Sequence, residues 1–256
     1  MYGAPFTRPC VIIPVYNHGE TLDPVITAIR EGIDIPIILI DDGSDAETKR
    51  CLQNAVSARQ GLTLIGLTKN SGKGAAVMRG IDAARELGFT HALQIDADGQ
   101  HDAGRIPFFL AEAAAHPEAV ICGLPRFDRS APASRLWGRK ISNGWAKIVT
   151  LSKALPDVLC GFRVYPVEPF WALAHFRPIN RRMGFDTEIL VRLYWQNIPV
   201  RFYPLRVIYP ENGRSHFRLV RDNLHIAWTF TRLFLGMIPR LPALLNRRRV
   251  RGGGAA

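Results

Sequence analysis

The chain has 256 residues, of which 47% are hydrophobic, so it is long enough to bury one substantial core and fits one globular domain with an appendage. Its four cysteines have neither metal-site spacing nor the density of a disulfide scaffold, and residues 1–9 lack the pattern of a signal peptide, which favours a cytoplasmic protein with reduced thiols. The net charge is +11, and residues 201–256, with eleven arginines against two acidic residues, supply +9 of it, which leaves nucleic acid, an anionic membrane surface and phosphorylated substrates open as partners.

Short apolar runs rich in β-branched residues alternate with amphipathic segments through the first half of the chain. They predict strands at 10–15, 35–40, 62–67, 91–95 and 119–122, with helices at about 20–30, 46–59, 73–87 and 104–115. This alternation is typical of an α/β fold with a doubly wound, mostly parallel sheet. In such sheets ligands bind at the carboxyl ends of the strands, where the strand order reverses.

Polar residues follow four of the predicted strands at that end. Clustered carboxylate and amide oxygens at a strand end suit Mg²⁺ or Mn²⁺, and such ions are usually shared with substrate phosphates, so the acidic run after the fourth strand predicts a metal site for nucleotide-diphosphate chemistry. The third cluster opens a helix and presents backbone N–H groups and a lysine to an anion, although it has no P-loop spacing. The clusters are Pro14, Tyr16 and Asn17 after the first strand; Asp41, Asp42 and Ser44 after the second; Asn70, Lys73 and Gly74 after the third; and Asp96, Asp98 and Gln100 after the fourth.

After about residue 125 the pattern changes to longer helices, followed by a predicted strand at 200–209 and a predicted helix at about 217–238. Charged residues interrupt that helix, so it contains no stretch of about 18 uncharged apolar residues that could span a membrane. Arginines interleaved with apolar residues over 217–245 predict either a membrane-interfacial helix or a helix whose arginine stems cover apolar surface on the domain. The basic, glycine-rich residues 246–256 are predicted to be disordered.

Six motifs occur in a fixed order along the chain: Ile13-Pro14-Val15-Tyr16-Asn17, Ile40-Asp41-Asp42-Gly43-Ser44-Asp45, Asn70-Ser71-Gly72-Lys73-Gly74-Ala75-Ala76, Asp96-Ala97-Asp98-Gly99-Gln100-His101-Asp102, Cys160-Gly161-Phe162-Arg163 and Phe185-Asp186-Thr187-Glu188. Together they resemble a GT-A glycosyltransferase of family 2, most of all the branch of dolichyl- and polyprenyl-phosphate mannose or glucose synthases. The resemblance covers most of residues 10–216. It implies a GT-A catalytic domain at 1–216, with a nucleotide-binding half at about 8–125 and an acceptor half at about 126–216.

The resemblance also implies how the strand-end clusters work. Asp98 and Gln100 would hold the divalent cation with Asp96 nearby, and Asp98 would be catalytic because the cation stabilises negative charge on the leaving diphosphate. An alternative for the second cluster is helix capping, a role that Asp45 alone could fill. His18 stands where the synthases commonly carry glutamate, which leaves UDP-, GDP- and dTDP-sugars open as donors. The residues expected to contact the nucleotide are Pro14, Tyr16, Asn17, Asp41, Asp42, Ser44, Asn70, Lys73, Gly74 and Asp96.

An alcohol acceptor would need a carboxylate to take its proton, and Asp186 and Glu188 are the candidates. Because residues at i and i+2 do not share a helix face, only one of them can point at the sugar, and we favour Asp186. A phosphate acceptor needs cations instead of a base, since guanidinium groups bind phosphate oxygens in a bidentate fork. The candidates for that role are Arg135, Arg139, Ser142, Arg163, Arg214 and Ser215.

The sequence therefore predicts a metal-dependent inverting glycosyltransferase that moves a hexose from a nucleotide-diphosphate sugar to a membrane-associated lipid. Polyprenyl phosphate is the favoured acceptor, and a hydroxyl-bearing glycolipid or polyene-type lipid is the alternative. The protein would act at the cytosolic face of an anionic membrane as a peripheral protein. A basic nucleic-acid-binding protein is a distant alternative, disfavoured because the aromatic residues do not follow an RNA-binding pattern. A sugar-nucleotide-binding protein without turnover ranks low, since the expected acidic residues are all present.

Overall fold

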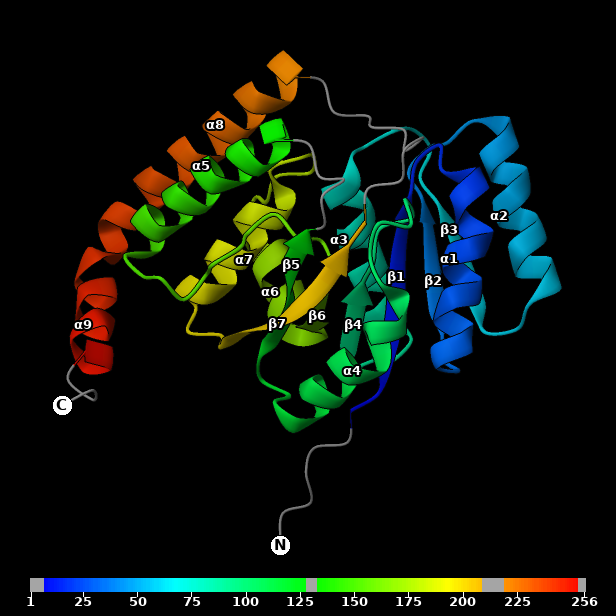
Figure 1. The fold of residues 1–256 in the computed structure, drawn as a ribbon, viewed down its shortest axis with the longest axis horizontal. Coiled ribbons are helices and arrows are strands. Elements are labelled where there is room, and N and C mark those ends of the chain that lie inside the picture. Colours follow the sequence, from blue (N-terminus) through cyan, green and yellow to red (C-terminus); the bar gives the residue numbers. More distant parts are fainter. Residues whose placement is uncertain (1–6, 128–132, 209–218, 253–256) are drawn as a thin grey trace, which may run out of the picture.

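The computed structural model describes residues 7–127, 133–208 and 219–252, and these form one seven-stranded sheet flanked by helices (Figure 1). The strand order is β3-β2-β1-β4-β6-β5-β7. The predicted strands all occur, with ends displaced by a few residues. The strands are β1 (Pro9–Val15), β2 (Ile37–Asp41), β3 (Leu62–Gly66), β4 (His91–Gln94), β5 (Val120–Phe127), β6 (Arg163–Pro166) and β7 (Val200–Val207).

The sheet is mostly parallel, as the alternating pattern predicts. β1 pairs in parallel with both β2 and β4, and β5 pairs in parallel with β7. The exception is β6, which runs antiparallel to β4 and to β5 and joins the two parallel parts of the sheet. Its four residues are buried but begin with an arginine and end with a proline, so no apolar run marks this strand in the sequence.

Two layers of helices cover the two faces of the sheet, because alternate strand residues point to opposite faces. In β1, Cys10 and Ile12 belong to one buried cluster, while Val11 and Ile13 belong to the other. The first cluster includes residues of α3, α5, α6, α7, α8 and α9, and the second includes residues of α1, α2 and α4. The helices are α1 (Gly19–Gly32), α2 (Ala46–Ala58), α3 (Lys73–Glu86), α4 (Ile106–Ala115), α5 (Ala133–Thr150), α6 (Val167–Phe176), α7 (Phe185–Trp195), α8 (Leu219–Met237) and α9 (Leu241–Gly252).

The C-terminal segment differs from its prediction. Residues 246–252, predicted to be disordered, are the second half of α9, so that prediction is wrong for them, while 253–256 lie outside the described residues. Packing explains the helix: Leu244 is buried against the domain. Arg247 donates hydrogen bonds to the backbone carbonyls of Tyr194 and Trp195, at 2.8 and 3.0 Å. These contacts hold α9 against the C-terminal end of α7.

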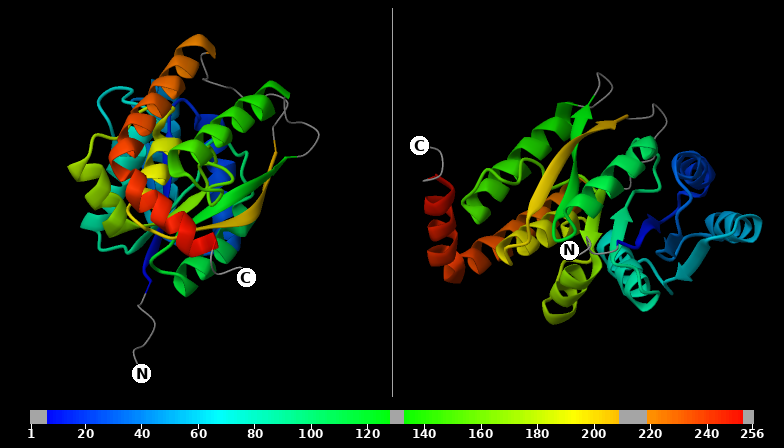
Figure 2. Two further views of the ribbon diagram at one scale, coloured as in Figure 1. Left: turned by 90° about the vertical axis from the view of Figure 1, so that its left-hand side faces the viewer. Right: turned by 90° about the horizontal axis from the view of Figure 1, so that it is seen from below.

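The long helices α5 and α8 lie side by side at one end of the molecule (Figure 2). The ring of Trp145 on α5 lies 6.2 Å from the ring of Phe230 on α8. Among the helices of the described residues, none is long and apolar enough to cross a membrane.

Candidate functional site

The strand order brings together the predicted clusters that follow β1, β2 and β4, because these three strands are neighbours. Hydrogen bonds tie the loops to one another. The backbone N–H of Asn17 donates to Oγ of Ser44 at 3.1 Å, and the backbone N–H of Asp45 donates to Oδ1 of Asn17 at 2.9 Å. Thr21 at the start of α1 donates to the carbonyl of Ala97 at 2.6 Å, which links the first loop to the acidic run. Asn17 has a φ of 54°, a conformation that asparagine tolerates better than most residues.

The two aspartates at the end of β2 are buried and organise the surrounding loops. Oδ1 of Asp41 accepts the backbone N–H of Ser44 at 2.8 Å. The two carboxylate oxygens of Asp42 accept the backbone N–H groups of Ser71 and Gly72, at 2.7 and 2.8 Å. Burial raises the pKa of Asp42, and these two hydrogen bonds act against that shift. Asp42 therefore joins the loop after β2 to the loop before α3.

Helix α2 obtains its N-terminal cap from the next acidic residue. Oδ1 of Asp45 accepts the backbone N–H of Thr48 at 2.8 Å. The alternative that the sequence left open, in which Asp41 and Asp42 cap this helix, is therefore wrong. Pro14 and Tyr16 lie at the end of β1 and just after it, beside these loops.

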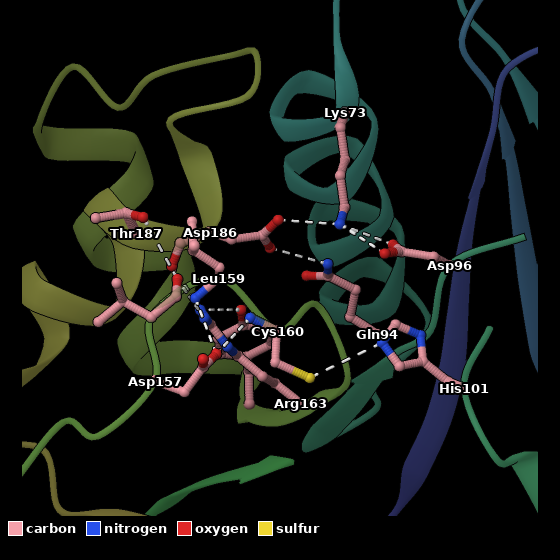
Figure 3. A network of polar contacts seen from close by, with 12 residues as sticks. Lys73, Gln94, Asp96, His101, Asp157, Leu159, Cys160, Arg163, Asp186 and Thr187 are labelled. Atoms are coloured by element: carbon pink, nitrogen blue, oxygen red, sulfur yellow. Dashed lines mark hydrogen bonds and ion pairs between the residues drawn. The ribbon is translucent and has the colours of Figure 1, made fainter. Parts of the chain in front are cut away.

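The centre of the site is a cluster of charged residues from three elements (Figure 3). Nζ of Lys73, at the start of α3, lies 2.8 and 2.9 Å from the two carboxylate oxygens of Asp96, which follows β4. The same ammonium lies 2.9 Å from Oδ2 of Asp186 at the start of α7. Gln94 donates through Nε2 to Oδ1 of Asp186 at 3.1 Å. The sequence predicts Lys73, Asp96 and Asp186 as separate site residues, and the fold makes them one network.

The charges in this cluster reinforce one another. Burial acts to lower the pKa of Lys73, but Asp186 and Asp96 outweigh it and raise that pKa above its usual value. Burial acts to raise the pKa of Asp96, but the neighbouring Lys73 outweighs it and holds that pKa below its usual value. Lys73 and Asp96 are therefore both charged at neutral pH.

Glycines make room for this network. A Cβ atom on Gly161, in the predicted Cys160–Arg163 motif, would lie 2.6 Å from Nζ of Lys73 and 2.9 Å from Oδ2 of Asp96. A Cβ atom on Gly74 would lie 2.6 Å from the carbonyl oxygen of Asn180. Gly74 is predicted as a nucleotide contact, but its observed role is to let α3 pack against the segment that leads into α7.

The remaining predicted metal ligands, Asp98 and Gln100, lie in the same strand-end loop as Asp96 and are half-buried. Oδ1 of Asp98 accepts the backbone N–H of Gln100 at 3.0 Å. No group of three or more His, Cys, Asp or Glu side chains in the described residues is already arranged around a metal position. The donor set still fits a hard divalent cation, because it consists of carboxylate and amide oxygens and because Asp96 already binds a cationic group with both of its oxygens.

His101, which the sequence leaves without a role, lies directly after the metal-ligand candidates. Its Nε2 is 3.8 Å from Sγ of Cys160 (Figure 3). Burial acts to lower the pKa of His101, but Cys160 and the carboxylates of Asp96 and Asp98 raise it to about 9. The only signal for this residue in the sequence is its place in the acidic run.

The side chain of Glu188, the other candidate base, is fully buried. Its Oε1 accepts from Nε of Arg192 at 2.8 Å, and its Oε2 accepts the backbone N–H of Asn180 at 2.9 Å. Arg232 of α8 approaches it at 3.5 Å. Glu188 thus holds α7, α8 and the preceding segment together, and a catalytic role for it stays a prediction. Asp186 faces the cluster.

Three of the predicted acceptor-phosphate ligands make contacts within the protein, and their role toward a phosphate stays a prediction. Arg163 is fully buried and donates to the carbonyls of Asp186 and Val158 at 2.6 and 2.9 Å. Ser142 is buried within α5, with 5% of its surface exposed. The guanidinium of Arg139 is paired with the carboxylate of Asp157. The side chain of Arg135, and Arg214 and Ser215 entirely, lie outside the described residues.

Asp157 is a residue that the sequence reasoning missed, and it organises the start of the Cys160–Arg163 motif. Its Oδ1 accepts the backbone N–H groups of Leu159 and Cys160 at 3.1 and 2.9 Å. Burial acts to raise the pKa of Asp157, but Arg139 and these hydrogen bonds lower it. The only signal for this role in the sequence is that Asp157 is a single acidic residue within an apolar stretch.

Residues 10–174 match the family model described as glycosyl transferase family 2, which is more than half of the chain. The chain belongs to glycosyl transferase family 2. A dolichyl-phosphate beta-glucosyltransferase of Dictyostelium discoideum is 29% identical over 211 residues, which are 74% of this chain and 63% of that protein. An undecaprenyl-phosphate 4-deoxy-4-formamido-L-arabinose transferase of Pseudomonas fluorescens is 29% identical over 161 residues, 60% of this chain and 46% of that protein. The chain thus spans less than two thirds of the length of either family 2 relative.

The fold is also that of a solved glycosyltransferase structure. Glucosyl-3-phosphoglycerate synthase from Mycobacterium tuberculosis, in complex with Mn²⁺, UDP-glucose and phosphoglyceric acid, matches with a TM-score of 0.69. The match covers 89% of this chain and 80% of that one at 16% identity. This similarity confirms the predicted α/β, GT-A fold with its helical C-terminal end.

Proposed function

We propose that this family 2 protein is a metal-dependent inverting glycosyltransferase that moves a hexose from a nucleotide-diphosphate sugar to a polyprenyl phosphate. The observation that carries the proposal is the network of Lys73, Asp96 and Asp186 at the carboxyl ends of the parallel strands. Both relatives bear names that state a polyprenyl-type phosphate acceptor, dolichyl phosphate or undecaprenyl phosphate. We propose an acceptor of the same class, a polyprenyl phosphate, for this chain.

Asp96, Asp98 and Gln100 would hold Mg²⁺ or Mn²⁺ in this proposal. The cation would supply positive charge next to the diphosphate as that group leaves the sugar. The solved synthase with Mn²⁺ and UDP-glucose supports a divalent cation on this fold. In this chain, hydrogen bonds from Gln94 and Lys73 orient Asp186, and buried Arg163 holds the backbone carbonyl of Asp186.

The loops after β1, β2 and β3 would bind the nucleotide. Their hydrogen bonds to one another, through Asn17, Ser44 and Asp42, fix the shape of this region before a donor arrives. Tyr16 and Asn70 flank it on the loops after β1 and β3. We propose UDP as the first nucleotide to test, with GDP and dTDP as the alternatives.

With a phosphate acceptor the nucleophile is already anionic, so Asp186 need not remove a proton. With a hydroxyl-bearing lipid, Asp186 would be the base, since Glu188 is fully buried. Among the proposed acceptor-phosphate ligands we give most weight to Arg135, Arg214 and Ser215, because Arg139 is paired and Ser142 and Arg163 are buried.

An exposed apolar face on α5 and on α8 and α9 supports peripheral binding to an anionic membrane. The apolar residues of α5 recur at three- and four-residue spacing, so they share one side of the helix. Lys140 and Lys147 are exposed on the same helix, which contains no acidic residue. Apolar area combined with basic residues binds anionic bilayers reversibly. The exposed apolar residues are Trp137, Ile141, Trp145 and Ile148 on α5, and Trp228, Phe234, Leu235, Ile238 and Leu245 along α8, the following turn and α9.

A two-step experiment tests the proposed function. Thermal unfolding with Mn²⁺ and UDP, GDP or dTDP identifies the base, since a bound nucleotide raises the unfolding temperature. Sugar transfer from the matching donor is then measured with a polyprenyl phosphate, with the corresponding polyprenol and with 3-phosphoglycerate. Transfer to the polyprenyl phosphate alone supports the proposal. Transfer to the polyprenol supports the hydroxyl-lipid alternative, and salt-dependent binding of arbitrary DNA without any transfer would favour the nucleic-acid alternative.

A further inference from the structure

The ammonium of Lys73 is paired with two carboxylates inside the protein. A lysine has three N–H donors, and Nζ has three carboxylate oxygens within 2.9 Å, two on Asp96 and one on Asp186. In this arrangement the charge of Lys73 is directed at Asp96 and Asp186. This differs from the sequence expectation that Lys73 faces the anionic donor.

The position of Lys73 is built into the fold. The lysine stands in the first turn of α3, whose N-terminus is fixed by the hydrogen bond from the backbone N–H of Gly72 to Asp42. Gly161 borders the ammonium so closely that any Cβ atom there would lie 2.6 Å from Nζ. The ammonium is therefore confined between the strand-end loop and the start of α7.

This confinement has an electrostatic consequence for a divalent cation. Asp96 is the first carboxylate of the proposed metal-binding set, and both of its oxygens already contact a positive charge. The single charge of Lys73 offsets part of the negative charge of Asp96 and Asp186, and the ammonium repels an incoming cation. The diphosphate of a donor adds negative charge that outweighs the single charge of Lys73.

We propose that Lys73 is a resident counter-cation that weakens the binding of a free divalent cation and so makes tight metal binding depend on the donor diphosphate. This inference rests on the proposed metal-dependent function. It assigns Lys73 as a positioning residue, which acts through Asp96 and Asp186. The consequence is an order of events in which cation and nucleotide enter the site together, and the acidic cluster does not hold the cation between turnovers.

The test is a titration of the full chain with Mn²⁺, followed by the electron paramagnetic resonance signal of free Mn²⁺, with and without UDP. Without nucleotide, Lys73→Met should bind Mn²⁺ at least about tenfold more tightly than the wild type, because the competing charge is gone. With saturating UDP the difference should shrink. Lys73→Arg keeps the charge and should behave as the wild type does.

Two further variants make the result unambiguous. Lys69→Met removes an exposed lysine from the same loop and should leave Mn²⁺ binding unchanged. If Lys73→Met does not fold, as judged by circular dichroism, Lys73→Gln keeps a hydrogen-bond donor without the charge and should show the same gain.

The outcomes separate this inference from the proposed function. If the wild type binds Mn²⁺ with UDP but the folded neutral variants bind free Mn²⁺ no more tightly than the wild type, the counter-cation role is overturned and the metal-dependent function stands. If no variant binds Mn²⁺ even with UDP, both proposals fail.

Discussion

The two halves of the site differ in how well local sequence patterns predict them. In the half formed by β1 to β4, the predicted polar clusters meet at adjacent strand ends, and their loops are hydrogen-bonded to one another. In the half formed by α5 to α7, Glu188 and Arg163 are fully buried and Arg139 is paired with Asp157. A residue just past a parallel strand is placed at the ligand edge by the strand itself. For a charged residue on a helix or inside a strand, the tertiary packing decides whether its side chain points into the site or into the core.

The strongest test of the first half is Asp98→Asn, which removes one ligand charge with little change in volume. We expect turnover to fall on the order of 1,000-fold, because the cation that stabilises the leaving diphosphate is lost. Sugar transfer is measured with Mn²⁺ and the donor found by thermal unfolding. The control, Asp34→Asn, changes an exposed aspartate and should keep full activity. Full activity of Asp98→Asn would contradict its role as a metal ligand, and the first half of the site would then be no better predicted than the second.

The second half is tested by Glu188→Ala, which should destabilise the protein by about 3–5 kcal/mol, because it leaves Arg192 beside a buried site with no partner. Denaturant unfolding measures the loss. The control is Glu168→Ala, which breaks an exposed ion pair with Arg85 and should cost about 0–1 kcal/mol. Equal losses in the two variants would contradict the structural role of Glu188.

Asp157→Asn should reduce stability at neutral pH by about 1–3 kcal/mol, because Arg139 loses its charged partner. The folded-state pKa of Asp157 lies below its usual value of 3.8, so its charged form contributes stability that is complete above that value and is lost as the pH falls through the lowered pKa. The gap between wild type and variant should therefore be constant from pH 5 to 7 and narrow below about pH 4. Urea unfolding across this range measures it, and a gap independent of pH would contradict the ion pair.

The smallest expected effect concerns the exposed face on α5 and α8. Trp137→Ala combined with Trp228→Ala should weaken binding to anionic liposomes about three- to tenfold, because two exposed aromatic side chains no longer enter the bilayer interface. Sedimentation with liposomes measures the change. Phe176→Ala removes an exposed aromatic from α6 and serves as the control. Unchanged sedimentation of the double variant would contradict a role of these exposed residues in membrane binding.

Sequence alone determined the α/β class, the order of the parallel strands along the chain, and the acidic and polar clusters that follow β1, β2 and β4. It could do so because hydrophobic periodicity marks strands and because ligand residues at strand ends are local in the chain. The tertiary structure decided what no local pattern encodes. It inserted the short antiparallel β6, ordered α9 through Leu244 and Arg247, and drew Lys73, Asp96 and Asp186 from three elements into one network. The physical reason is that the burial and pairing of a charge depend on contacts between residues far apart in the chain.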